Sequence, residues 1–276
     1  MRVALVQVEE VATPVVALVT PAGLYEVAAL EEHYRMWCPC QAADFHTRVV
    51  ACRGAGLDEL AARLEAGPRP PGLRLAPGDY LPLPPCDVER SGYLEVRAYQ
   101  VGQDPPALEL RSSRALVGDA QPATVSGSRL VAEVGLAVVL GEDLHRASFR
   151  EAQAAVLGTT LAIAWRGEGP VSAQLGPSLI LRRPMRDLAS LEVRVEHRGR
   201  SIGAGRVGDW AHPPAAAVAF ASHQLPLRAG DVVGLGPLPG GTLEVEAGET
   251  VEATLHPLLR LTGRASLQPG SDAWRG

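Results

Sequence analysis

The chain contains no lysine, and all 26 of its basic residues are arginine. No lysine is therefore available to form a Schiff base with a carbonyl substrate or to act as a general base. Long apolar runs are also absent, since none approaches the roughly 18 residues that a membrane span requires. The beginning does not resemble a signal peptide, because its first apolar residues soon meet Glu9 and Glu10. We expect a soluble, cytoplasmic protein with no membrane partner.

Concentrated positive charge is missing too. The formal net charge is -5, and the sequence has no long basic block that could neutralise a phosphate backbone. We therefore expect no nucleic-acid partner.

Cysteine is scarce, at Cys38, Cys40, Cys52 and Cys86. Cys38 and Cys40 are separated by one residue, whereas redox pairs and zinc knuckles usually have two between them. A zinc site of Cys38, Cys40, His33 and His46 is one interpretation. Ordinary reduced cysteines are the other.

Two apolar segments have the pattern of buried strands at the centre of the fold. Residues 130–141 first alternate and then become continuously apolar before Gly141, and residues 157–165 follow after a charged connection. A Gly176-Pro177 pair lies in a third expected strand at 175–180. Other strands are expected at 93–99 and at 191–197 with a following hairpin, and a further hairpin is expected at 243–253. Helices are expected at 28–37, 57–67 and 213–223, so the predicted class is mainly β (α+β).

A change in composition suggests where the chain divides. Residues 67–85 are rich in proline and glycine, which predicts an extended linker. We therefore predict a small N-terminal β-rich domain with its linker at 1–85 and a main domain at 86–276.

The order of these pieces over roughly residues 90–262 resembles the fumarylacetoacetate hydrolase superfamily. The matching features are the run from Glu133 to Gly141, the Gly158-Thr159-Thr160-Leu161 strand, the Leu175-Gly176-Pro177 turn, a polar hairpin, a helix, and the loop Ala229–Gly236. The resemblance implies a rolled, mixed β-sandwich that pairs into a homodimer. It also implies Mg²⁺ or Mn²⁺ held by two glutamates and one or two aspartates, chelating a 2-oxo acid or 1,3-dicarbonyl compound and stabilising its enolate.

Several positions depart from the family's pattern. Glu133 matches the first glutamate, but the second falls on Gly135 and the aspartate falls on Ala164. The family's lysine has no counterpart, and Pro237 replaces a threonine of the late glycine loop. A single carboxylate does not hold Mg²⁺ in the family's manner. We therefore predict that the chain has no metal cofactor.

Glu133 is the candidate catalytic residue. An isolated carboxylate in an apolar pocket has a raised pKa and can act as a general acid or base. The alternative for Glu133 is an ion pair with an arginine. Candidate substrate-binding residues are Arg111, Arg114, Trp165, Arg166, Gln174 and Gly236. The arginines would pair with a carboxylate or enolate, and Trp165 would form a wall, with core packing as its alternative.

Three functions remain open. The first is a divergent enzyme that acts without metal on a small carbonyl compound, as an isomerase, dehydratase, decarboxylase, cyclase or C–C hydrolase. The second is a catalytically inactive family member that binds a ligand or a partner subunit. The third keeps the family chemistry with a metal held by Glu133, Glu168 and His145.

Overall fold

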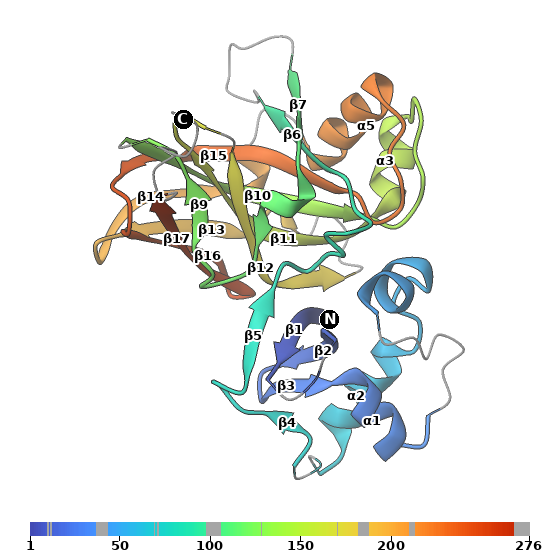
Figure 1. Cartoon of the computed structure of the whole chain (residues 1–276). Coiled ribbons are helices and arrows are strands. Elements are labelled where there is room, and N and C mark those ends of the chain that lie inside the picture. The colour runs from blue at the N-terminus through green and yellow to red at the C-terminus, as the bar shows by residue number, and fades with distance from the viewer. Residues whose placement is uncertain are drawn as a thin grey trace, which may run out of the picture.

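A computed structural model describes residues 1–267 except 10, 12, 37–43, 69, 71, 98–105, 128, 170, 182–187 and 210–212. Strands dominate this part of the chain, which confirms the mainly β class predicted from the alternating pattern (Figure 1). The described helices are α1 (Val27–His33), the π-helix η1 (His46–Ala51), α2 (Leu57–Ala66), the 3-10 turn η2 (Ser113–Ala115), α3 (Phe149–Ala155), the 3-10 turn η3 (Val207–Asp209) and α5 (Pro214–Gln224).

The larger of two sheets has the order β4-β3-β2-β1-β12-β11-β10-β15-β6-β7, with β5 beside β1 and β8 beside β12. Its strands are β1 (Arg2–Val8), β2 (Val15–Thr20), β3 (Gly23–Glu26), β4 (Arg74–Leu75), β5 (Tyr80–Leu83), β6 (Tyr93–Arg97), β7 (Ala107–Arg111), β8 (Leu116–Val117), β10 (Leu130–Leu140), β11 (Val156–Arg166), β12 (Ser172–Leu181) and β15 (Val232–Val245). The two central apolar segments form the antiparallel pair β10–β11, in which Glu133 lies opposite Ala164.

The smaller sheet has the order β14-β13-β16-β17-β9. Its strands are β9 (Ala123–Val125), β13 (Glu192–His197), β14 (Arg200–Arg206), β16 (Thr250–His256) and β17 (Leu259–Leu267). The predicted hairpin after residue 197 is therefore confirmed as β13–β14.

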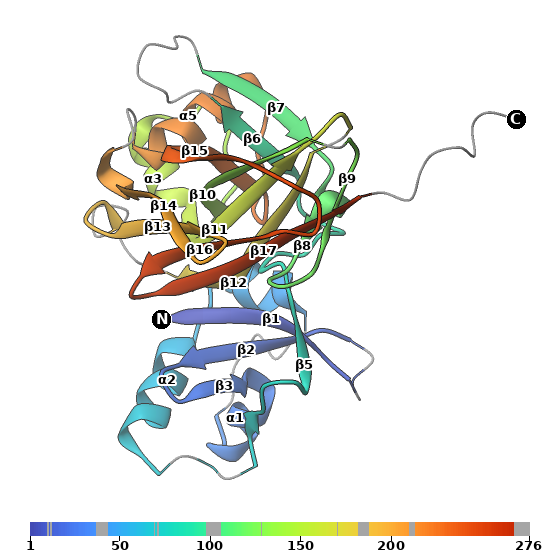
Figure 2. The ribbon, with the colours of Figure 1, turned by 90° about the vertical axis from the view of Figure 1, so that its left-hand side faces the viewer.

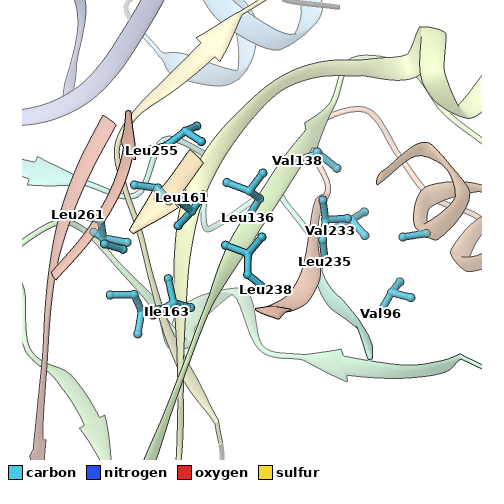
Figure 3. Close-up of a cluster of buried hydrophobic side chains, with 14 of the residues drawn as sticks. Val96, Leu136, Val138, Leu161, Ile163, Val233, Leu235, Leu238, Leu255 and Leu261 are labelled. Atoms are coloured by element: carbon cyan, nitrogen blue, oxygen red, sulfur yellow. The ribbon is translucent and has the colours of Figure 1, made fainter. Parts of the chain in front are cut away.

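The main hydrophobic core lies between the two sheets (Figure 3). Even-numbered residues of β10, such as Leu136 and Val138, belong to this core together with Leu255 and Leu261 of the smaller sheet. Side chains alternate between the two faces of a strand. The odd-numbered residues of β10, including Glu133, therefore lie on the opposite face of the larger sheet.

The N-terminal part of the chain is joined to the rest by the larger sheet itself. β1 pairs with β12 through Arg2–Ile180 and Val3–Leu179, so that β1, β2 and β3 continue the sheet beyond β12 (Figure 2). A second core combines residues of both parts, among them Leu57 and Leu179. The predicted linker at 67–85 is only partly a linker, because it contains β4 and β5, and β5 pairs with β1.

Helices α3 and α5 begin at residues that suit a helix N-terminus. Ser148 caps α3 in a reciprocal capping box with Glu151, so the charged connection between β10 and β11 contains a helix. Pro214 begins α5 at the position where a missing backbone N–H costs nothing. None of the described helices has the length and apolarity needed to cross a membrane.

Two cysteines of the described residues are in different states. Cys52 is disulfide-bonded, so the expectation of reduced cysteines is wrong for this residue. Cys86 is free and buried, and burial raises the pKa of its thiol to about 12. Cys38 and Cys40, the candidate zinc ligands, lie outside the described residues.

A candidate functional site on the charged face of the large sheet

Glu133 lies near the beginning of β10 and is buried, with 7% of its side chain exposed. It is one of six charged residues on strands β6, β7, β10 and β11. We call this group the charged cluster: Glu95, Arg97, Glu109, Arg111, Glu133 and Arg166. Three carboxylates and three guanidinium groups balance in formal charge.

The sheet order brings these residues together from distant parts of the chain. β15 separates β10 from β6, and Gly234 of β15 is paired with Glu95. A Cβ atom at position 234 would lie at ordinary contact distance from Glu95 and Tyr93, so this point of β15 packs directly against the cluster. β7 adds Glu109 opposite Glu95 and Arg111 opposite Tyr93.

Arg166 is the central cation of the cluster. Its Nε donates to Glu133 Oε2 at 2.5 Å, and its Nη2 donates to both oxygens of Glu95 at 2.9 Å. Its Nη1 lies 3.5 Å from Glu109 Oε2. Burial lowers the pKa of Arg166, but the adjacent Glu95 and Glu133 outweigh burial and raise it above its ordinary value. Arg166 therefore stays positively charged.

The other two arginines lie at the side of the cluster. Arg97 donates to Glu133 Oε1 at 3.1 Å and to Glu109 Oε1 at 3.4 Å, and 38% of its side chain is exposed. Arg111 forms an ion pair with Glu109 through Nη2. Its Nε is buried without a hydrogen bond and lies 3.7 Å from Glu95. Arg97 is thus the guanidinium of the cluster that solvent reaches most easily.

Glu133 is not the isolated carboxylate that the apolar sequence around it suggested. Both of its oxygens accept from arginines, one from Arg97 and the other from Arg166. The alternative interpretation, an ion pair with an arginine, is confirmed. The sequence predicts Arg166 and Arg111 as site residues but does not identify Arg97, Glu95 and Glu109. Their alternation on two consecutive strands, with Glu95 and Arg97 on one face, was the available signal.

Two predicted substrate-binding residues serve the core instead. Trp165 is fully buried and points away from Arg166, because the two are consecutive on β11. Its Nε1 donates to Gln174 Oε1 at 2.8 Å, and Gln174 donates in turn to the backbone carbonyl of Gln121. Gln174 Oε1 also accepts from the backbone N–H of Arg264. The prediction that Trp165 and Gln174 line the substrate site is therefore wrong, and core packing of Trp165 is confirmed.

The remaining two candidates lie at different places. Arg114 is 80% exposed and pairs with Glu89 at 3.5 Å, away from the charged cluster. Gly236 has a positive φ of 72° and its carbonyl oxygen faces Gly135 across the β10–β15 pair. Gly236 shapes the sheet beside the cluster without offering a side chain.

The residues around Glu133 do not suit the divalent cation that the family resemblance implies. The carboxylate of Glu133 is bonded to arginines on both sides, and a side chain at position 135 would overlap the carbonyl of Gly236. Ala164, opposite Glu133, has no side-chain oxygen to offer. Within the described residues, no group of three or more His, Cys, Asp and Glu side chains is arranged to hold a metal ion.

The metal site of Glu133, Glu168 and His145 is excluded by strand geometry. Glu168 follows the end of β11 that pairs with the beginning of β10, whereas His145 follows the far end of β10. Leu140 lies seven positions after Glu133 on β10, which corresponds to roughly 23 Å at about 3.3 Å per residue. One ion cannot bind both ends of the hairpin.

Fold and site together define a member of one family. Residues 88–266 match the fumarylacetoacetate (FAA) hydrolase C-terminal family, and the chain belongs to it. The resemblance predicted from the order of motifs is confirmed. A search of curated proteins finds no match.

Solved structures with the same fold include enzymes of two reaction classes. The 2-hydroxyhepta-2,4-diene-1,7-dioate isomerase of Mycobacterium marinum has a TM-score of 0.71 and 20% identity, covering 98% of this chain and 100% of its own. A maleylpyruvate hydrolase of a Sphingobium species, in complex with manganese(II) and pyruvate, has a TM-score of 0.72, 16% identity and the same coverage. The 5-carboxymethyl-2-hydroxymuconate delta-isomerase of Mycobacterium smegmatis has a TM-score of 0.69 and 18% identity over 98% of this chain and 100% of its own. The structural neighbours are thus isomerases and hydrolases that share this fold.

Proposed function

We propose that the chain is an enzyme that acts on a small 2-oxo acid or 1,3-dicarbonyl compound at the charged cluster, without a divalent cation. The observation that carries this proposal is Arg97, a partly exposed guanidinium bonded to a buried carboxylate, Glu133. Neighbours of the same fold include a hydrolase solved with pyruvate, which is a 2-oxo acid.

The chemistry follows from the unequal strength of the contacts to Glu133. Arg166 holds Glu133 at 2.5 Å, whereas Arg97 contacts it at 3.1 Å and is more exposed. The carboxylate of a 2-oxo acid can pair with Arg97 in place of Glu133, because arginine binds carboxylates through two parallel hydrogen bonds. The exchange frees Glu133 Oε1 to take a proton from the carbon beside the ketone. The guanidinium groups then stabilise the enolate that forms.

Proton exchange with solvent tests this step directly. The methyl protons of pyruvate, in D₂O with EDTA, would be followed by NMR in the presence of the wild type, Glu133→Gln, Arg97→Gln and Arg114→Gln. We expect the wild type and Arg114→Gln to accelerate exchange equally. A missing general base costs about 10²- to 10⁴-fold in rate, so Glu133→Gln should lose the acceleration by about that factor. No acceleration by the wild type, with pyruvate or with a 1,3-dicarbonyl compound, would contradict the proposal.

A catalytically inactive binding protein is the second candidate. The observation that favours it is the saturation of Glu133, since neither carboxylate oxygen is left without an arginine. Such a protein would be stabilised by a 2-oxo acid in a thermal unfolding experiment yet would leave the exchange rate unchanged. The two measurements on the same samples therefore separate an enzyme from a binding protein.

A further inference from the structure

The three carboxylates of the charged cluster surround a cation that belongs to the chain itself. Arg166 contacts Glu95, Glu109 and Glu133 at once, with distances from 2.5 to 3.5 Å. Arg97 contacts only Glu109 and Glu133, and Arg111 contacts only Glu95 and Glu109. Arg166 is therefore the one cation in the described part of the cluster that bridges all three acids.

Burial makes this arrangement obligatory for the acids. Glu95 and Glu133 are 3% and 7% exposed, and buried carboxylates need a compensating positive charge. Arg166 is itself only 16% exposed, and the planar guanidinium has five N–H donors to satisfy oxygens on several sides. A divalent cation with oxygen ligands would need the same carboxylates. The guanidinium and a metal ion thus compete for one set of ligands.

We infer that the side chain of Arg166 is an internal cation that closes this site to divalent metal ions. While Arg166 lies between them, Glu95, Glu109 and Glu133 are not arranged to hold a metal, and its removal lets these three carboxylates close around one. The positive charge that a metal would bring is then built into β11. It cannot be lost to a chelator or exchanged for another ion. Metal binding is measured without substrate, so the outcome is independent of the chemistry proposed above.

The matched pair of variants is Arg166→Ala and Arg97→Ala. Each removes one guanidinium bonded to Glu133, but only Arg166 bridges the three acids. Mn²⁺ binding would be measured by electron paramagnetic resonance and by thermal unfolding with and without about 1 mM MnCl₂. For a Kd of about 10 to 100 µM, we expect the Tm of Arg166→Ala to rise by roughly 3 to 8 °C with Mn²⁺. The wild type and Arg97→Ala should bind no Mn²⁺ and show no shift.

Two further variants assign the site. Adding Glu133→Gln to Arg166→Ala should abolish Mn²⁺ binding, whereas adding Glu89→Gln, an exposed acid outside the cluster, should leave it intact. Stoichiometric Mn²⁺ on the wild type, lost in Glu133→Gln, would overturn the inference. A folded Arg166→Ala protein without Mn²⁺ binding would overturn it as well. If Arg166→Ala does not fold, Arg166→Met, which keeps the volume of the apolar stem, takes its place. If neither variant folds, with or without Mn²⁺, the inference is also contradicted.

Discussion

The backbone carbonyl of Gly236 lies where a side chain of residue 135 would begin. An ideal Cβ on Gly135 would overlap that oxygen, and the next nearest atom is the carbonyl carbon of Gly236. Both are backbone atoms, so the overlap cannot be relieved by a change of side-chain rotamer. Gly135 of β10 is paired with Pro237 of β15, the residue after Gly236, at a point where the register shifts. This contact explains why position 135 carries no side chain.

Gly135→Ala should therefore lower the free energy of unfolding by about 1–3 kcal/mol, the usual cost of overpacking, and Gly135→Glu by more. Urea unfolding followed by circular dichroism measures the change. Gly205→Ala on β14 is the control, because its Cβ would meet its nearest atom at 3.3 Å and its backbone has no positive φ. A Gly135→Ala protein as stable as the wild type would show that β15 can move away from β10.

Removing the most buried acid of the charged cluster should destabilise the protein strongly. Glu95→Ala removes the more deeply buried of the two carboxylates that Arg166 and Arg111 share, the other being Glu109. Breaking a buried pair by removing one partner costs about 3–5 kcal/mol. Glu89→Ala removes an acid whose pair with Arg114 is largely exposed, and we expect a change within about 0.5 kcal/mol. Equal denaturation midpoints for the two variants would contradict the structural role of Glu95.

Gln174 should matter for stability and not for substrate. Gln174→Ala leaves the N–H of Trp165 and the backbone N–H of Arg264 without their acceptor inside the core. An unsatisfied buried donor costs about 1–3 kcal/mol, so we expect a loss of about 2–4 kcal/mol. Gln224→Ala, at the exposed end of α5, should change stability by no more than about 0.5 kcal/mol. The proton-exchange rate per folded Gln174→Ala molecule should match the wild type, and a selective loss of that rate would restore Gln174 as a site residue.

The protein should lose stability at acid pH as the carboxylate of Glu249, which contacts His197 at the end of β13, becomes protonated. Its pKa is lowered from 4.5 to about 2, first by the backbone N–H of Glu246 and then by Arg198. A carboxyl group with a depressed pKa in the folded state stabilises that state above its ordinary pKa, and the stabilisation disappears as pH falls towards the folded value. The difference in Tm between wild type and Glu249→Gln should be largest above pH 4.5 and vanish near pH 2.

Calorimetry over that pH range tests the prediction at two salt concentrations, since the group is exposed and salt screens exposed charges. Glu65→Gln, on an exposed position of α2, controls for the general effect of losing one negative charge. A Tm difference that stays constant from neutral pH to pH 2 would show that Glu249 does not contribute in this way.

The sequence predicted the strands well because their signal is local. The alternating and continuous apolar patterns at 130–141 and 157–165 correspond to β10 and β11. The same periodicity also argues against the prediction that Trp165 and Arg166 both line the site. Trp165 and Arg166 are consecutive on a strand, so their side chains lie on opposite faces and cannot both line one site.

The charged cluster could be predicted only in part, because it depends on pairings that local patterns do not contain. Glu95 meets Arg166 from 71 residues away, through the parallel neighbours β6 and β15. Nothing in the run around Glu133 shows which charged strand will come to lie beside it. An apolar context therefore made Glu133 look isolated, although two arginines bind it in the folded chain.

The pairing of β1 with β12 limits how the chain can be divided. A fragment beginning after β5 would keep the residues that match the family, but β12 would lose its neighbour at Leu179 and Ile180. Its backbone N–H and C=O groups would form a free edge beside apolar side chains, a template on which other molecules add strands. We expect such a fragment to self-associate. In the whole chain, the N-terminal strands cover the β12 side of the sheet that holds the charged cluster and so protect it.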